Sequence, residues 1–355
     1  MSLGFIAVFA AWFWILPDAE ESITERRYLA KCPALSLSSV ANGSFMNGFE
    51  KYMLDQFPLR DGFRTLKAAA NAKVFMQMDN NGLYSVGEHL SKLDFPTDFD
   101  SVDHAARRFR YVYDAYLRNS GTKTYLSVIP DKNVFIASPN GYPDKDYKAL
   151  VERLGKGFPE AEYIDISGLL SADDFYYTDS HWRQERILKV ADEIADKMGA
   201  ERIGKCEKHD AGVSFYGVYY GQAALPHAPE SLFYLDNAVI RGLKVYNIET
   251  SSDIPVYDLG AAAGRDPYEM FLGGARSIIR ITNPNAAKER RLIVFRDSFG
   301  SSIAPLLTAG YSEITLVDIR YISPSSLGKL IDFTKADDAL FLYSASVINN
   351  SETIK

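Results

Sequence analysis

The chain has 355 residues, of which 47% are hydrophobic and 24% are charged. Lysine and arginine number 39 against 46 aspartate and glutamate residues, so the formal net charge is −7. This composition excludes a disordered or collagen-like chain, and the acidic balance argues against a surface that wraps nucleic acid. The length predicts roughly two domains, or one large α/β domain that carries an insertion.

The two cysteines, Cys32 and Cys206, are too few for a disulfide scaffold. One pair can form, but nothing in the sequence requires it. Neither cysteine has the Cys-x-x-Cys or Cys/His spacing of a metal site, and four histidines also lack metal-ligand spacing: His89, His104, His209 and His227. The chain contains no phosphate loop or dinucleotide fingerprint, so we expect no metal and no cofactor.

The first segment is an uncharged apolar run, LGFIAVFAAWFWIL, from Leu3 to Leu16. It is shorter than the roughly 20 residues that a membrane-spanning helix needs, and it lacks the basic region and cleavage site of a signal peptide. Three interpretations remain: a signal or anchor segment whose beginning was removed, a buried core helix, or an amphipathic interfacial helix. The run is apolar on all faces and ends in aromatic residues, which favours a truncated signal or membrane anchor over residues 1–17.

Residues 18–97 are expected to form helices and loops that pack on the core. The charged stretch from Glu20 to Lys31 predicts a helix, whereas Cys32 to Asn47 is rich in Ser, Gly and Asn and predicts a loop. From Phe49 to Met78 the helical spacing of apolar residues predicts short helices, which are interrupted at Pro58.

The rest of the chain alternates between short strands and helices, which is typical of a parallel sheet with helices on both faces. The predicted strands are 124–129, 163–166, 291–295, 313–319 and 339–343, and the predicted helices are 98–118, 146–154, 184–198, 303–307 and 325–333. Residues 210–284 are rich in Gly, Tyr and turn signals, so we interpret them as a β-rich insertion. The predicted fold is α/β, a doubly wound parallel sheet of about five strands formed by residues 98–209 and 285–355.

In such a sheet, reactive groups lie where strands end and helices begin. The segment Arg296-Asp297-Ser298-Phe299-Gly300 directly follows the apolar strand 291–295. A serine in a sharp turn between strand and helix exposes its hydroxyl, and the helix N-terminus offers backbone N–H groups to a developing oxyanion. The alternative is that Asp297 or Ser298 is only the N-cap of that helix.

The segment Asp179-Ser180-His181-Trp182 precedes the helix predicted at 184–198. A nucleophilic serine needs a base, and the base needs a carboxylate that fixes its tautomer and stabilises the imidazolium. Residues two apart do not face each other on a helix, so Asp179 and His181 can pair only in the turn before it. The alternative is a helix cap at Asp179 or Ser180, with His181 packed in the first turn.

Together, FYYTDSHW and the later RDSFGSSIAPLLTAGYSEITLVDIRYI resemble the DHHW family of Gram-positive surface proteins. That family is similar to the SGNH-hydrolase-like domains of periplasmic alginate O-acetyltransferases. The resemblance begins at LPDAEESITERRYLAKCP and continues through DQFPLRD, NGLY and VIPDKNVF, and the Asp-x-His block precedes the Ser block as in the family. It implies Ser298 as nucleophile, His181 as base and Asp179 as the residue that orients the base. Trp182 matches the last letter of the motif and is expected to support the His turn by packing.

The sequence departs from the family pattern at three places. The double histidine of the family is Ser180-His181 here, and Arg296 stands where a GDSL esterase has glycine. Relatives usually follow Gly273-Gly274 with asparagine, a natural oxyanion donor, but Ala275 cannot donate from its side chain. Losing such a donor costs about a hundredfold in rate, and backbone N–H groups of Ser298, Gly273 and Gly274 are the candidate replacements.

Basic residues near strand ends are candidates for substrate binding: Lys132, Arg296 and Arg320. Lys132 matches a Pro-x-Lys that recurs in the family, and its alternative is a solvated loop lysine. Arg320 follows a strand in Asp318-Ile319-Arg320-Tyr321, and its alternative is an ion pair with Asp318 that supports the loop.

The resemblance implies an SGNH-like serine esterase or O-acetyltransferase that acts on acyl groups of a cell-surface polysaccharide. It also implies an extracytoplasmic location in the cell envelope, a membrane-bound acyl donor as partner, and association with the membrane through the N-terminal segment. Nucleic acid is not an expected partner. The alternatives are a structural surface protein without a small ligand, or a weakly active or inactive glycan-binding or envelope-assembly protein. Ala275 favours the weakly active or inactive glycan-binding or envelope-assembly protein. Aromatic residues of the insertion favour it too, because they either stack on sugars or pack in the sheet: Tyr216, Tyr219, Tyr220, Phe233 and Tyr234.

Overall fold

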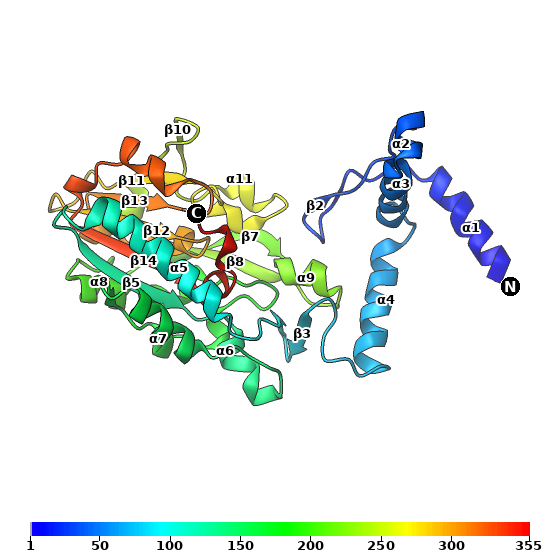
Figure 1. Ribbon diagram of the computed structural model, residues 1–355, viewed down its shortest axis with the longest axis horizontal. Helices are drawn as coiled ribbons and strands as arrows, with labels where there is room; N and C mark the ends of the chain where they lie inside the picture. Colours follow the sequence, from blue (N-terminus) through cyan, green and yellow to red (C-terminus); the bar gives the residue numbers. More distant parts are fainter. Residues whose placement is uncertain (1) are drawn as a thin grey trace.

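The computed structural model describes residues 2–355 and shows an α/β body with an N-terminal arm beside it (Figure 1). The arm holds most of its structure in helices, with one small hairpin between them. Its elements are α1 (Ser2–Ile15), β1 (Glu21–Ser22), β2 (Arg27–Tyr28), α2 (Leu37–Ala41), α3 (Ser44–Asp55) and α4 (Arg60–Lys73). Among these described residues, none of the helices combines the length and the apolar character needed to cross a membrane.

Aromatic contacts hold α1 against the rest of the arm. The rings of Phe13 and Tyr52 meet edge to face with centroids 5.3 Å apart, and those of Phe9 and Phe57 stack at 5.4 Å. The break between α3 and α4 falls at Pro58, as the sequence predicts, because proline disfavours the helical conformation in the residue that precedes it.

The helix predicted from Glu20 to Lys31 is wrong, because this stretch forms the hairpin of β1 and β2. Its charges pair across space instead of along a helix. The carboxylate of Glu25 lies 2.6 Å from Nη1 of Arg60 and 3.2 Å from Nη2 of Arg64, both on α4. We call residues 18–35, which connect α1 to α2 through this hairpin, the strap.

The body is built on an eight-stranded sheet in the order β10-β9-β11-β13-β12-β14-β5-β6. The strands are β5 (Lys123–Ile129), β6 (Glu162–Tyr163), β9 (Lys244–Asn247), β10 (Ser252–Ile254), β11 (Ile278–Thr282), β12 (Arg291–Arg296), β13 (Glu313–Val317) and β14 (Asp338–Ser344). Strands β13, β12, β14, β5 and β6 pair in parallel, whereas β11, β9 and β10 add antiparallel pairs.

The sheet is therefore mixed and mostly parallel, and the predicted parallel sheet of about five strands is too small. Its parallel part matches the prediction, but the segment 210–284 contributes further strands to the same sheet instead of forming a separate layer. Strand β11 pairs with β13 through Ile278–Thr282, where alternating isoleucines match the buried face of the sheet.

The alternation of side chains along the strands separates two cores. On β12, Leu292 and Val294 pack with α8 (Leu188–Met198), whereas Ile293 and Phe295 pack with α5 (Phe99–Val112) and α7 (Tyr147–Gly157) on the other face. The helices of the body are α5 (Phe99–Val112), α6 (Asn133–Ile136), α7 (Tyr147–Gly157), α8 (Leu188–Met198), α9 (Val218–Ala223), α10 (Ala238–Arg241), α11 (Leu259–Ala262), α12 (Gly300–Ile303) and α13 (Ala345–Asn349). Helices thus cover both faces of the sheet, as predicted (Figure 1).

Two further hairpins lie at the edge of the body. The pair β3 (Leu83–Val86) and β4 (His89–Lys92) leads from the arm into the body, and the pair β7 (Glu207–Phe215) and β8 (Glu230–Asp236) belongs to the predicted insertion. Phe215 and Leu232 of the second hairpin pack with Tyr268 and Phe271 in a small core of their own. This core lies beside the loop that carries the DSHW motif, because Tyr176 belongs to it as well.

Candidate active site

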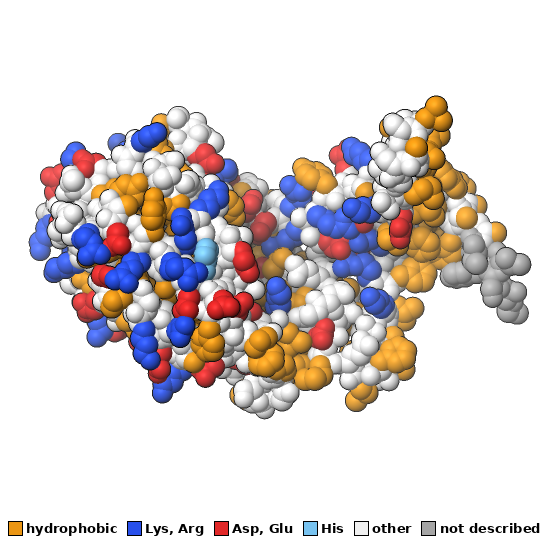
Figure 2. All heavy atoms as spheres, in the orientation of Figure 1, with side chains coloured by type: hydrophobic (Ala, Val, Ile, Leu, Met, Phe, Trp, Pro, Cys, Tyr) orange, Lys and Arg blue, Asp and Glu red, His pale blue; other side chains and the backbone are white. Residues whose placement is uncertain are grey.

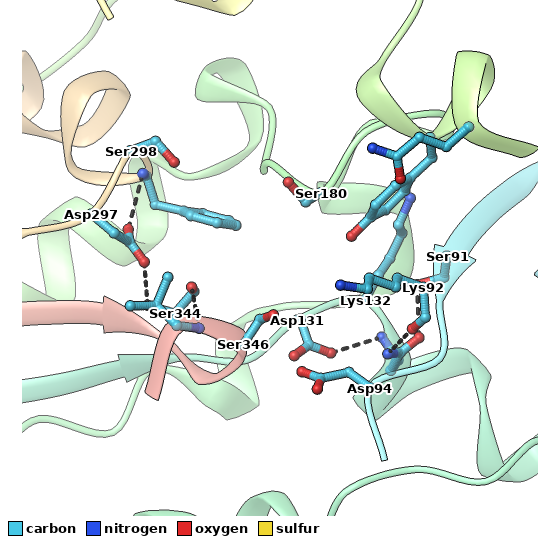
Figure 3. Close-up of a pocket in the computed structure, with 15 residues that line it drawn as sticks. Ser91, Lys92, Asp94, Asp131, Lys132, Ser180, Asp297, Ser298, Ser344 and Ser346 are labelled. Atoms are coloured by element: carbon cyan, nitrogen blue, oxygen red, sulfur yellow. Dashed lines mark hydrogen bonds between the residues drawn. The ribbon is translucent and has the colours of Figure 1, made fainter. Parts of the chain in front are cut away.

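A pocket of about 260 Å³ opens where the parallel strands end (Figure 3). Ser298 and Asp297 follow β12, and Ser344 ends β14, the neighbouring strand. Most of the lining side chains are polar: Ser91, Lys92, Asp94, Asp131, Lys132, Asn133, Ser180, Tyr219, Gln222, Asp297, Ser298, Ser344 and Ser346. The topology thus brings together at this edge of the sheet residues that are far apart in the chain.

The turn that carries Ser298 is fixed by Asp297. The buried Asp297 carboxylate accepts hydrogen bonds from the backbone N–H of Phe299 at 3.1 Å and of Ser344 at 2.8 Å, so it ties the end of β12 to the end of β14 (Figure 3). Helix α12 starts at Gly300, and Phe299 before it already has helical backbone angles and makes no side-chain cap, so the Asp297 bond to the Phe299 N–H is the side-chain bond that closes this turn. Within the described residues the backbone N–H of Ser298 has no acceptor, which leaves it available to an oxyanion.

Asp179, His181 and Ser298 form one continuous line of hydrogen bonds. His181 Nδ1 lies 2.6 Å from Asp179 Oδ1, and His181 Nε2 lies 2.7 Å from Ser298 Oγ. A carboxylate only accepts, so Nδ1 carries the proton and Nε2 is free to accept the hydroxyl proton of Ser298. The pair Asp179 and His181 lies in the turn before the helical segment, as the spacing of the two residues requires. This is the geometry of a nucleophile, its base and an orienting carboxylate.

The Asp179 carboxylate is buried but strongly stabilised in its charged form. It also accepts hydrogen bonds from the backbone N–H of His181 at 3.1 Å and of Val218 at 2.8 Å, and Arg26 Nη1 lies 3.6 Å away. Burial by itself raises the pKa of Asp179, but His181, Arg26 and the Val218 N–H together hold this pKa well below its ordinary value. Asp179 is therefore an ionised partner for an imidazolium.

Comparison with known proteins now adds to this geometry. A scan of the sequence against family models finds no match, and a search of the curated proteins finds none either. Among solved structures, a DHHW family protein from Eubacterium siraeum aligns with a TM-score of 0.62 at 18% identity, over 78% of this chain and 95% of the other. This chain has the fold of a DHHW family protein. The resemblance predicted from the two motifs is thereby confirmed at the level of the fold.

Further solved structures align with this DHHW fold. Bacillus cereus PatB1, in a structure with a sulfonyl adduct, gives a TM-score of 0.59 at 16% identity, over 75% of this chain and 97% of PatB1. The O-acetyltransferase domain of Pseudomonas putida AlgJ aligns less closely, with a TM-score of 0.47 at 11% identity, over 76% of this chain and 92% of that domain.

The His181 ring is held between aromatic side chains. Tyr268 stacks on it with centroids 3.9 Å apart and an interplanar angle of 14°, and the ring of Phe299 lies at 4.8 Å. Ser302 connects these supports, because its hydroxyl accepts hydrogen bonds from Trp182 Nε1 and from the Tyr268 hydroxyl, each at 2.8 Å. Trp182 itself is fully buried and meets Phe299 edge to face at 5.4 Å. The His181 ring therefore has one packed orientation.

Trp182→Ala is expected to lower the free energy of unfolding by about 3–5 kcal/mol, because it leaves a cavity beside Phe299 and removes the Ser302 hydrogen bond. Trp182→Phe, which keeps a large ring but no donor, is expected to cost less than half of that. Urea unfolding of both variants measures the two differences. A loss below about 1 kcal/mol for Trp182→Ala would show that this side chain does not support the turn.

Glu230 holds the segment just before the DSHW motif, and the sequence did not predict this role. Its carboxylate accepts hydrogen bonds from the backbone N–H groups of Tyr177 at 2.8 Å and Thr178 at 2.9 Å, and Arg183 Nη2 lies 2.5 Å from it. It belongs to β8, about 50 residues away in the chain, and no short motif links the two segments. Tyr268 and Ser302 were missed for the same reason.

Lys132 supports the same loop from the other side. Its side chain is buried, and its ammonium donates to the carbonyls of Leu90 at 2.6 Å, Tyr176 at 2.8 Å and Tyr177 at 3.0 Å, which occupies its three N–H groups. Burial lowers the pKa of Lys132 to about 7. The alternative of a solvated loop lysine is wrong, and substrate contact through Lys132 stays a prediction, although the residue lines the pocket.

The other substrate-binding candidates lie outside the pocket lining. Arg320 donates to both Asp318 oxygens, at 2.9 and 2.7 Å, so the predicted alternative of an Asp318/Arg320 ion pair is confirmed. Arg296 is fully buried, with Nη1 3.9 Å from the same carboxylate. Gly300 is required beside it, because a Cβ at this position would lie 2.6 Å from Arg296 Cβ. Both arginines thus surround Asp318 beneath the turn that carries Ser298.

Gly273 and Gly274 do not line the pocket either. Their φ angles are +71° and +76°, which explains why glycine stands at both positions. The Gly274 N–H donates to the carbonyl of Phe271 at 3.1 Å and is already paired. Of the residues of the three predicted backbone donors, Ser298 is the one that lines the pocket. An oxyanion role for Gly273 and Gly274 stays a prediction.

Over residues 2–355, no group of three or more His, Cys, Asp or Glu side chains is arranged to hold a metal ion. Cys32 is exposed and Cys206 half-buried, and both are free thiols.

His89 packs edge-on against Tyr177, and we expect its burial to make the stability of the protein depend on pH. Burial lowers the pKa of His89 to about 4, so between this value and about 6.5 the unfolded chain binds a proton that the folded chain does not. The stability contribution is present above pH 6.5 and is lost as the pH falls through this window, by up to about 3 kcal/mol. In His89→Phe the free energy of unfolding is expected to lose up to about 3 kcal/mol less over this pH window, as measured by unfolding curves at several pH values. An unchanged pH profile would contradict this account.

Proposed function

We propose that the protein is an SGNH-like serine enzyme that hydrolyses or transfers short acyl groups, acetyl above all, on a cell-surface polysaccharide. The observation that carries this proposal is the line of hydrogen bonds from Asp179 through His181 to Ser298, at the edge of a polar pocket. The motif resemblance to alginate O-acetyltransferases supports the choice of chemistry. An extracytoplasmic location, with membrane contact through the apolar α1 and an acyl donor held at the membrane, is part of the same proposal.

The reaction begins when Ser298 Oγ attacks the acyl carbonyl and its proton passes to His181 Nε2. Asp179 stabilises the imidazolium, and the Ser298 N–H donates to the developing oxyanion. His181 then returns the proton to the oxygen of the leaving alcohol, and the acyl group stays on Ser298 as an ester. Water or a sugar hydroxyl next attacks this ester while His181 again takes the proton, which gives hydrolysis or transfer.

The chemistry of the pocket suits a substrate that is rich in hydroxyl groups. Hydroxyl side chains line this pocket besides Ser298: Ser91, Ser180, Ser344 and Ser346 (Figure 3). Its volume of about 260 Å³ is below the roughly 300–1,000 Å³ of sites for drug-sized ligands, which favours a short acyl group over a long chain. Asp94 and Asp131 at one side share the single positive charge of the buried Lys145, which lies 2.6 Å from the Asp131 carboxylate.

The proposal is tested with p-nitrophenyl acetate, first alone and then with a soluble polysaccharide as acceptor. Release of p-nitrophenol that depends on Ser298 supports the enzyme, and acetyl groups found on the polysaccharide identify transfer. Ser301→Ala is the matched control, because this nearby buried hydroxyl has no hydrogen-bond partner and does not line the pocket. No turnover by the native chain, on either substrate, would overturn the proposal.

A glycan-binding protein without turnover is the second candidate. The observation in its favour is a second hollow of about 470 Å³, between the strap and the insertion, which is lined in part by Tyr216 and Tyr220. Phe233 and Tyr234 are less suited to sugars, because Lys208 lies over the first ring at 4.3 Å and His209 stacks on the second at 5.3 Å. A glycan array separates the candidates: binding without turnover, unaffected by Ser298→Ala, would favour this second function.

A further inference from the structure

One cation from the N-terminal arm reaches the candidate active site. Arg26 lies at the turn of the strap hairpin and has a φ of +55°, a conformation that is uncommon for residues other than glycine. Its side chain is 9% exposed although most of the strap is not buried, and its guanidinium donates to the carbonyl of Tyr216 and lies over the ring of Phe215. The side chain is therefore inserted into the body.

The guanidinium joins two carboxylates that hold the catalytic base from different sides. Nη1 of Arg26 lies 3.6 Å from Oδ2 of Asp179 and donates to Oδ1 of Asp266 at 2.9 Å. Asp179 orients His181 through Nδ1, and Asp266 is the N-cap of the 3-10 turn Pro267–Met270, which carries the Tyr268 ring stacked on His181. One side chain thus fixes both the orienting carboxylate and the element that packs on the imidazole.

The strap that carries Arg26 is held by contacts with the arm and with the body. Charged side chains of both signs gather on the arm on the side that faces the body (Figure 2). Within the arm, Glu25 of the strap pairs with Arg60 and Arg64 of α4. Arg64 also donates to the carbonyl of Gly221, where a Cβ would lie 1.8 Å from the carbonyl oxygen of Thr24. The close approach of Thr24 to α9 therefore needs glycine, and the same turn of the strap brings Arg26 to Asp179.

We propose that Arg26 is a positioning residue of the active site, through which the N-terminal arm completes the Asp179–His181 pair. The inference rests on the proposed function, since it assigns Arg26 a role in that reaction. Arg26 does not line the pocket, so it acts on the base and not on the substrate.

The sign of the electrostatic effect follows from the charges around the pair. The titratable groups that face Asp179, His181 and the ring stacked on it are Arg26, Lys132, Tyr219, Asp266, Tyr268 and Asp297. The positive charge of Arg26 is one of the interactions that hold the pKa of Asp179 below its ordinary value. Its removal leaves Asp179 with one charged partner fewer, and it leaves Asp266 without the guanidinium that ties both carboxylates together.

Arg26→Met, which keeps most of the side-chain volume, is the main variant. We expect kcat/KM to fall about 10- to 100-fold with KM nearly unchanged. Arg26→Lys is expected to restore most of kcat/KM. Arg265→Met is the matched control, because Arg265 ties the same hairpin to the body through Tyr28 and Glu21 without touching Asp179.

An NMR measurement of the His181 ring gives a readout that needs no turnover. In Arg26→Met the ring signals of His181, assigned with His181→Asn, are expected to move from their native positions, because the Asp179 carboxylate and the Tyr268 ring that contact the imidazole both lose a support. In Arg265→Met these signals are expected to stay in place. Unchanged signals and a loss of kcat/KM below twofold would overturn the proposal. So would equal effects of Arg26→Met and Arg265→Met, which would mean that Arg26 only fixes the strap. If the native chain turns over no ester, the proposed function fails, and the NMR comparison still decides whether Arg26 acts on His181.

Discussion

Ser298→Ala is expected to lower kcat/KM for p-nitrophenyl acetate by at least about 10³-fold. The variant removes the atom that forms the acyl-enzyme, and the hydroxyl that His181 Nε2 contacts at 2.7 Å. Its free energy of unfolding is expected to stay within about 0.5 kcal/mol of the native value, since Asp297 and not Ser298 ties the turn to β14. Steady-state kinetics and urea unfolding measure the two quantities.

Ser301→Ala provides the control for this substitution, because it removes a hydroxyl from the first turn of α12 without touching His181. Its kcat/KM is expected to stay within twofold of the native value. Equal activity in Ser298→Ala would refute Ser298 as the nucleophile, and equal losses in both variants would point to a damaged turn instead.

Asp179→Asn is expected to lower kcat/KM by about 10³- to 10⁴-fold. Asparagine keeps the shape of the side chain, but its amide is neutral and no longer stabilises an imidazolium. It also permits the wrong tautomer of His181, with the proton on Nε2, where it cannot accept from Ser298. The effect is measured in kcat/KM at a pH well above the acid limb, so that protonation of His181 does not contribute.

The control for Asp179→Asn is Asp173→Asn, since this neighbouring carboxylate is 78% exposed and does not contact the catalytic residues. Its kinetics are expected to match the native chain. A loss below tenfold for Asp179→Asn would mean that His181 does not depend on this carboxylate, and the role of Asp179 as orienter would be lost.

The local pattern predicted the parallel core well. Arg291 to Phe295 and Ala339 to Tyr343 are continuous apolar runs, and they form β12 and β14 because a strand buried on both faces needs such a run. The same reasoning failed for Glu20 to Lys31, because Glu25 in this stretch pairs with Arg60 and Arg64 of α4 and not with charges of its own segment. It also failed to place β11 in the sheet, since pairing partners are set by tertiary structure and not by the strand's own composition.

The candidate site was predictable where chemistry constrains residue types. The resemblance carried by the DSHW and RDSFG motifs implies Asp179, His181 and Ser298, and the structure brings them into hydrogen-bond contact. Their supports were not predictable. Tyr268 and Arg26 come from segments about 90 and 155 residues away from His181, and each acts through packing or charge that no short motif encodes.

The most direct test of this account is covalent labelling of the native chain with a fluorophosphonate and, separately, with a sulfonyl fluoride, followed by mass spectrometry of the digested protein. Both reagents need a serine that is activated by a neighbouring base. The account predicts one adduct on Ser298, present in Ser301→Ala, absent in Ser298→Ala and formed far more slowly in His181→Ala. No adduct in the native chain, an adduct on another residue, or a rate that His181→Ala leaves unchanged would contradict it.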